Sequence, residues 1–360
     1  MIIDIIKKRV KLNHDLNSFR RKVRSRKKRK NRNKSYDGLN TNERTDKRLE
    51  KEQNKRLVGY KIIKAPENFS LLDNTEEVLS FIRDVDGYFN ERQKVFIRLR
   101  KTNVISHDAI VVLLSKLIQF KASKIGFNGD FPNDEKSADI LKGSGFFEYL
   151  YKNFNNEDTY TFDKKIYTHA NKNVNPTLTS AIIEDASQKI WKEKRRCPGL
   201  QRVFIELMQN TNNHASNHKK GEKLWWSSIV HNKEEKKVCF SFIDYGVGIL
   251  DSLKNKKTGK FAKIFSIIKN IFKTQNNAEI LKLLLEGKIH ELIKEQAYNR
   301  GKGLPGIFKA CKTNNISNLI VITNNVYADV ANNDYKEINN NLSGTFVYWE
   351  LNINNKSIKD

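Results

Sequence analysis

Short apolar strands alternate with longer helical segments between Leu57 and Lys152, and this alternation limits the folds that the chain can adopt. Strands are predicted at LVGYKII, KVFIRLRK and KIGFNG, and helices at TEEVLSFIRDVDGYF, SHDAIVVLLSKLIQF and EKSADILKGSGFFEYL. Strands that alternate with helices pack as layered α/β structure. The chain has 360 residues, which leaves room for a second domain after this one.

The second half of the chain follows a break at Asn175-Pro176. Helices are predicted at LTSAIIEDASQKIWKE and FIELMQNTNNHA, and strands at VCFSFID, NLIVITN and SGTFVYWELNI. NEDTYTF and KKIYTHA are expected to form strands or a hairpin. We expect the stretch GEKLWWSSIVHNKEEKK to be a linker and the Asn-rich stretch before Ser343 to be a turn region.

Positive charge is concentrated at the start of the chain. The formal net charge is +26, and residues 1–34 contain 15 Lys and Arg against two acids, which gives 15 − 2 = +13. We expect these residues to be a mobile basic arm, followed by a polar linker to residue 56. Such an arm attracts nucleic acid phosphates or an anionic membrane surface. A tail that only improves solubility explains the same composition.

The sequence contains no signal for membrane insertion or disulfide bonding. No run of 18 apolar residues occurs, so no membrane-spanning helix is expected. The MIIDII start is too short and too quickly charged for a secretory signal. Cys197, Cys239 and Cys311 are far apart and odd in number, which suits a reducing compartment. A cytoplasmic location is therefore expected.

The predicted helix FIELMQNTNNHA carries Glu206, Asn210 and His214 at intervals of four, which places them on one face. A carboxylate can orient or deprotonate a nucleophile, and a carboxamide oxygen one turn away can bind Mg²⁺. A solvated helix face explains the same spacing, so this motif alone does not distinguish a Mg²⁺ site from an exposed polar surface.

A second motif follows the apolar strand VCFSFID, which ends in Asp244 and continues through Gly246 and Gly248. Glycines at such a place let the backbone turn tightly or let a ligand come close. A carboxylate at the strand end can accept a hydrogen bond from an exocyclic amine such as adenine N6. An ordinary glycine turn after a strand is the alternative.

The third motif, GKGLPGIFKACKTN, is a glycine-rich loop that opens a helix. Backbone N–H groups near Gly301, Gly303 and Gly306 can bind phosphates at the helix N-terminus, and Lys302 can add a positive charge. The loop is not a P-loop, because the Gly-Lys-Ser/Thr ending is missing. It is not a dinucleotide-binding fingerprint either, because no strand directly precedes it.

Four pieces therefore stand in order: Glu206-x-x-x-Asn210, Asp244-x-Gly-x-Gly248, Gly301-x-Gly-Leu-x-Gly306 and Gly344-Thr345. This order resembles the GHKL superfamily of ATPases, which joins gyrase, heat-shock chaperones, histidine kinases and mismatch-repair ATPases. The resemblance covers about residues 178–354, and the helix motif is most similar to the sensor-kinase and anti-sigma-kinase branch. It implies a two-layer α/β sandwich of the Bergerat type, with a mixed sheet covered on one face by helices.

The resemblance also implies ATP and Mg²⁺ as cofactors and a role for each motif residue. Glu206 would be the general base for water or a substrate hydroxyl, and Asn210 would bind Mg²⁺. Asp244 would bind the adenine amine. The cofactor-binding residues would be Asp244, Gly246, Gly248, Gly301, Lys302, Gly303 and Thr345. Thr211 stands where alanine is common in the family, and we expect this departure to be tolerated; His214 is expected to be structural.

Residues 250–300 would form the ATP lid, with helices in KFAKIFSIIKNIFK and NAEILKLLLEGKIHELIKEQ. An apolar stripe at helical spacing comprises Phe261, Ile264, Phe265, Ile268, Ile271 and Phe272. The stripe either packs inside the domain or forms a partner or dimer surface that closes with ATP.

The stretch VFIRLRKTNVISHDAIVVLLSKL resembles a STAS domain, the fold of bacterial anti-sigma-factor antagonists. In that family a serine in the turn before the helix is phosphorylated, and the matching residue here is Asp108. Asp108 would imitate the phosphorylated state, or the domain would be a scaffold without this switch. His107, in the same turn, is a further candidate for phosphorylation.

The expected organisation is a basic arm and linker (1–56), a STAS-like domain (57–153), a connecting segment (154–177) and a GHKL domain (178–354). The expected function is a nucleotide-dependent switch that hydrolyses ATP slowly and relays lid movement to a protein partner or to a second copy, through the lid or the STAS-like domain. The alternatives are a Ser/Thr kinase of the anti-sigma type, and a nucleic-acid-binding protein for which ATP is only a conformational ligand.

Overall fold

The computed structural model describes residues 21–22, 24–26, 57–151, 165–169, 174–214, 225–254, 270, 273, 276–289 and 303–359. The chain divides into two compact units, Met1–Gly59 and Tyr60–Asp360. In the first unit, residues 21–22 and 24–26 are helical and exposed, and the rest of the expected basic arm lies outside the described residues. The second unit is mixed α/β with parallel and antiparallel sheets, as the sequence predicts.

Residues 60–151, here called the N-terminal module, form a small parallel sheet in the order β1-β3-β5 with helices around it. Its strands are β1 (Tyr60–Lys64), β2 (Asn68–Phe69), β3 (Lys94–Arg98), β4 (Val104–Ile105) and β5 (Phe127–Gly129). Its helices are α3 (Thr75–Asn90), α4 (His107–Ala122), α5 (Glu135–Lys142) and α6 (Phe146–Tyr151). The four helices and strands β1, β3 and β5 each lie within or overlap a predicted segment, and the last predicted helix is broken at its glycines as expected. Strands β2 and β4, which pair with each other, were not predicted.

The second part is built on a five-stranded sheet in the order β10-β11-β9-β8-β6. Its strands are β6 (Ile166–His169), β8 (Trp225–Asn232), β9 (Lys237–Asp244), β10 (Ser317–Asp329) and β11 (Asp334–Asn352). A further pair joins β7 (Arg195–Arg196) to β12 (Ile358–Lys359). All described pairs of the five-stranded sheet are antiparallel, whereas a mixed sheet was expected.

Helices α7 (Pro176–Trp191), α8 (Pro198–His214), α9 (Gly248–Lys254), α11 (Asn277–Leu285) and α13 (Gly303–Lys312) belong to this second part. Asn175-Pro176, read as a break in the sequence, starts α7: the Asn175 side chain accepts a hydrogen bond from the Leu178 N–H, and proline occupies the first helical turn.

Two predictions about irregular segments were wrong. The stretch expected to be a linker contains β8, which pairs with β9 along its full length and buries Trp225 and Trp226. The Asn-rich stretch expected to be a turn region continues β10 and β11 as a long hairpin, with register shifts near Asn324. Strands β8 and β9 form a hairpin that closes at Asn232 and Lys237, and β10 and β11 form the second hairpin. The polar and charged residues of both stretches conceal the apolar alternation that marks a strand.

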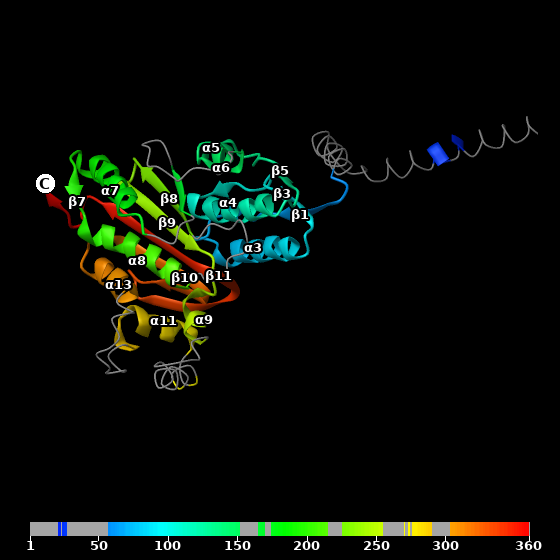
Figure 1. The fold of residues 1–360 in the computed structure, drawn as a ribbon. Helices are drawn as coiled ribbons and strands as arrows, with labels where there is room; N and C mark the ends of the chain where they lie inside the picture. Colours follow the sequence, from blue (N-terminus) through cyan, green and yellow to red (C-terminus); the bar gives the residue numbers. More distant parts are fainter. Residues whose placement is uncertain are drawn as a thin grey trace, which may run out of the picture. The chain divides into compact units, whose positions relative to one another are not determined.

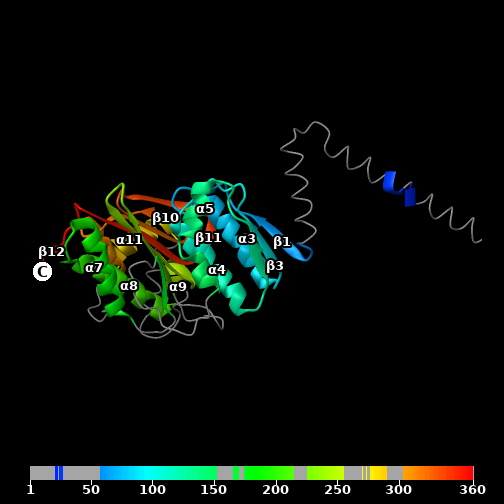
Figure 2. The same ribbon diagram turned by 90° about the horizontal axis from the view of Figure 1, so that it is seen from above.

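The five-stranded sheet is covered on both faces, whereas helices on one face were expected. Phe240 and Phe242 of β9 point into a core with α7, α8, α11 and α13, while Ile243 belongs to the core of the N-terminal module. Helices α3 and α4 therefore lie on the opposite side of the sheet from α8 and α13 (Figure 1; Figure 2). Among the described residues, no helix is both long and apolar enough to cross a membrane.

Candidate functional site

Helix α8 presents the predicted carboxylate and carboxamide at the edge of its buried face. Val203, Phe204 and Leu207 are buried against the sheet, which fixes the rotation of the helix. Glu206 and Asn210 are half-buried on the adjoining side. The spacing of four thus places both polar groups beside each other at the rim of the core, as predicted.

The first turn of α13 meets this polar side of α8 at Gly303. A β-carbon at Gly303 would lie 2.9 Å from Glu206 Oε2 and 3.3 Å from both terminal atoms of Asn210. Glycine therefore leaves space for the two side chains to face the start of α13, where backbone N–H groups lack helical partners. Gly301 and Lys302, also predicted for this place, lie outside the described residues.

Sequence reasoning missed Arg202, which lies one turn before Glu206 on α8. Its Nε is 3.6 Å from Glu206 Oε1, and its guanidinium covers Gly306, where a β-carbon would lie 2.7 Å from Nε. An arginine four residues before a glutamate on a helix is a signal that was available in the sequence. A carboxylate, a guanidinium and a helix N-terminus thus converge at one place.

Asp244 stands at the end of β9 and is held by hydrogen bonds from two other elements. The Thr345 N–H donates to Oδ1 at 3.0 Å, and the Thr211 hydroxyl donates to Oδ2 at 3.2 Å. Thr211 is buried and ties α8 to the strand end through a hydrogen bond that alanine could not make. Burial raises the pKa of the Asp244 carboxyl to about 7, although these two hydrogen bonds act to lower it.

The glycine turn after Asp244 is fixed by two residues of β10 that sequence reasoning missed. Gly246 lies in the bend, and Gly248 has φ +77° and would place a β-carbon 2.5 Å from Asn324 Oδ1. Asn324 donates to the Val247 carbonyl at 2.9 Å and accepts from the Leu250 N–H at 3.0 Å. Thr323 Oγ1 accepts from the Ile249 N–H at 3.0 Å. Glycine at position 248 is therefore required both by its backbone angle and by the approach of Asn324.

Two site predictions concern the N-terminal module. Asp108 is 5% exposed, and its carboxylate accepts hydrogen bonds from the Leu71 N–H, the Ala109 N–H and the Ser106 hydroxyl. It therefore orders the start of α4 from inside the module and presents no surface charge. Burial and the nearby Lys165 lower the pKa of His107 to about 4, which keeps its imidazole neutral near pH 7.

The raised pKa of Asp244 predicts how stability depends on pH. Between about pH 4 and pH 7 the folded protein binds a proton at Asp244 that the unfolded chain, with a pKa near 3.8, does not bind. The free energy of unfolding of the wild type minus that of Asp244→Asn should therefore fall as the pH rises toward 7 and then level off. The slope is at most about 1.4 kcal/mol per pH unit. Denaturant titrations without nucleotide measure it, and a flat difference would contradict the desolvated carboxylate.

The predicted site residues that the structure describes fall into two connected groups. Glu206, Asn210 and Gly303 meet between α8 and α13, while Asp244 and Thr345 meet at the paired ends of β9 and β11. Thr211, next to Asn210 in the chain, joins the groups. The described residues contain no cluster of three or more His, Cys, Asp or Glu suited to a metal ion. Comparison of the chain with protein-family models, curated proteins and solved structures found no match.

Proposed function

We propose that this chain binds ATP and Mg²⁺ as a GHKL-type ATPase and acts as a nucleotide-dependent switch. The observation that carries the proposal is the approach of Glu206 and Asn210 to Gly303 in the first turn of α13. A helix N-terminus favours anions, and a phosphate chain there would lie beside a carboxylate and a carboxamide. Glu206 and Asn210 would then both approach the phosphate chain from α8.

The adenine would bind at Asp244. Its carboxylate already accepts from Thr345 and Thr211, and each carboxylate oxygen keeps a further lone pair for an exocyclic amine. The turn through Gly246 and Gly248 would bring the protein backbone close to the adenine ring. Asn324 holds this turn in place through hydrogen bonds on both sides of Gly248.

The residues between α8 and α13 fit Mg²⁺ held jointly by protein and phosphates. Asn210 supplies a neutral amide oxygen, and Mg²⁺ in nucleotide sites takes few protein ligands because phosphates and waters complete its shell. The bound ion would neutralise charge on the phosphates. Glu206 would then orient or deprotonate the attacking water, and Arg202 would hold the Glu206 carboxylate until phosphate competes for the guanidinium.

The described residues of the proposed lid pack on the rest of the domain. Helix α9 is tied to β10 through Asn324, and α11 buries Ile280, Leu281 and Leu285 in the core with α13. The apolar stripe from Phe261 to Phe272 lies outside the described residues. In the proposal, movement of the lid is relayed to a protein partner or to a second copy.

Titration of the full-length protein with ATP in the presence of Mg²⁺ tests the proposal. Asp244→Asn keeps the shape of the side chain but removes the charge and places an amide donor where the adenine amine would donate. We expect ATP affinity to fall about 10- to 100-fold, as for loss of a hydrogen bond to a charged group. Asp139→Asn, which changes a carboxylate with 77% side-chain exposure on α5, is the control and should bind as the wild type does.

Two outcomes would contradict the proposal. One is a folded wild-type protein that binds no ATP at any accessible concentration. The other is equal ATP affinity in the wild type and in Asp244→Asn, which would place the nucleotide elsewhere on the chain.

A further inference from the structure

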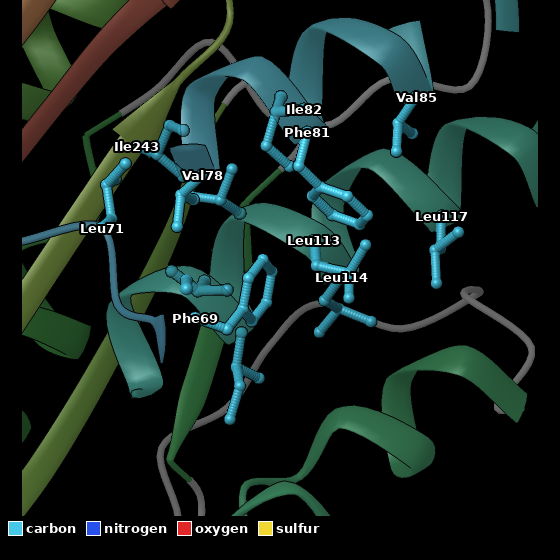
Figure 3. Packing of buried hydrophobic residues seen from close by; sticks show 14 of the residues in the cluster. Phe69, Leu71, Val78, Phe81, Ile82, Val85, Leu113, Leu114, Leu117 and Ile243 are labelled. Atoms are coloured by element: carbon cyan, nitrogen blue, oxygen red, sulfur yellow. The ribbon is translucent and has the colours of Figure 1, made fainter. Parts of the chain in front are cut away.

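Both chain neighbours of Asp244 are buried in the core that β9 shares with the N-terminal module. Ile243 is fully buried and Tyr245 is 7% exposed, and both belong to the same apolar cluster as α3 and α4. Figure 3 shows Ile243 beside Leu71 and Val78 of the module. Because side chains alternate along a strand, Asp244 faces α8 while its neighbours face the opposite layer.

Tyr245 makes specific polar contacts with α4 in addition to packing. Its hydroxyl lies 2.5 Å from the Ser115 hydroxyl and donates to the Val112 carbonyl at 3.3 Å. The ammonium group of Lys116 lies 4.2 Å from the centre of the tyrosine ring. Lys116 is itself almost fully buried and pairs with Asp86 of α3 at 2.8 Å. The turn after Asp244 is therefore connected to α4 directly and to α3 through Lys116.

A second connection reaches the strand that donates to Asp244. The Glu76 carboxylate on α3 accepts hydrogen bonds from the backbone N–H groups of Asn339, at 2.7 Å, and Asn340, at 3.2 Å. Arg83 donates to the Asn340 side chain at 2.6 Å. These asparagines belong to β11, which continues to Thr345. The turn after Asp244 and the strand that donates to its carboxylate are thus both in contact with the N-terminal module.

We propose that Tyr245, with Ser115 and Lys116 on α4, is a positioning residue through which the N-terminal module sets the affinity of the Asp244 site for nucleotide. The inference rests on the proposed function, since it concerns the same site. If α4 shifts, Tyr245 moves and carries Asp244 and the glycine turn with it. By thermodynamic linkage, nucleotide bound at Asp244 stabilises the arrangement of α4 by the same free energy. A partner that binds the module would therefore read or change nucleotide occupancy.

The test uses the full-length wild type, Tyr245→Phe, Ser115→Ala and the double variant, with ADP·Mg²⁺ as the probe. Each single change removes one hydroxyl of the buried pair and should raise the dissociation constant about three- to tenfold. The double variant should be no weaker than the weaker-binding single variant, because both changes remove the same contact. In the wild type, ADP·Mg²⁺ should slow amide hydrogen exchange across α4, and Tyr245→Phe should reduce this protection.

Val85→Ala is the control for a merely structural effect. It truncates a buried side chain of α3 in the same core, as Figure 3 shows, and it removes no contact of Tyr245 described above. It should lower the melting temperature without changing ADP affinity. If the wild type binds ADP·Mg²⁺ but α4 exchange and the affinities of the single variants do not change, the inference is overturned and the nucleotide site stands. If the folded wild type binds no nucleotide, the proposed function is overturned as well.

Discussion

Alanine in place of Gly344 should lower the melting temperature by about 5 °C. Gly344 has φ +131°, where a side chain is strained by on the order of 1–3 kcal/mol, and a β-carbon would lie far inside contact distance of the Asp244 carbonyl oxygen. The clash is between the backbones of two paired strands, β11 at Gly344 and β9 at Asp244, because Thr345 is in register with Asp244. Neither strand can yield without breaking the ladder. Strain and clash together should cost about 3 kcal/mol, which at an unfolding entropy of about 2.1 cal/mol/K per residue corresponds to this shift in a unit of about 300 residues.

Two other glycines provide matched controls for Gly344→Ala. Gly87 in α3 has no atom within 4 Å of its β-carbon position, and alanine there should maintain or raise the melting temperature. Gly145 also has open space but φ +86°, so Gly145→Ala measures the backbone strain without the clash. Differential scanning calorimetry of the three variants separates the effects. If Gly344→Ala had the same melting temperature as Gly87→Ala, β9 and β11 would not approach each other as described.

Glu206→Gln should reduce ATP hydrolysis about 10²- to 10⁴-fold while changing ATP affinity only a fewfold. Glutamine has the same shape and can still face Gly303, but it cannot accept a proton from water. Steady-state release of inorganic phosphate measures the rate. Glu184→Gln, a half-exposed carboxylate on α7 that pairs with Lys194, is the control and should hydrolyse ATP at the wild-type rate.

The same experiment distinguishes hydrolysis from protein phosphorylation. Equal rates in the wild type and in Glu206→Gln would contradict a role of Glu206 in the reaction. γ-Phosphate that appears on protein instead of in solution, and that depends on Glu206, would favour the kinase alternative, because one carboxylate suits either acceptor. The wild type is therefore assayed with and without candidate partner proteins.

The elements and motifs that could be predicted are those that local sequence determines. Helix α8 shows its apolar face and its Glu206–Asn210 spacing within four turns, and α3 and α4 begin close to the residues expected. Asp244 was recognisable because an apolar strand ends where glycines begin. Each of these signals arises from neighbours within about one helical turn or one strand.

The features that sequence reasoning missed depend on contacts between distant residues. Thr211 acquires its role only when α8 lies over the end of β9, and Asn324 only when β10 lies beside the glycine turn. The second covered face of the sheet arises because Ile243 and Tyr245 pack on α3 and α4, which come much earlier in the chain. Ser115 of α4, for example, is 130 residues before Tyr245. No short pattern around these residues predicts such pairings.

The measurement that tests the central claim most directly is competition between ATP and GTP for the full-length protein in the presence of Mg²⁺. In the proposed site adenine would offer an amine donor to Asp244, whereas guanine would present a carbonyl oxygen at the equivalent position and would face the carboxylate without a hydrogen bond. The account predicts that ATP binds at least about 100-fold more tightly than GTP and that Asp244→Asn removes most of this preference. Equal competition by ATP and GTP in the wild type would contradict adenine recognition by Asp244.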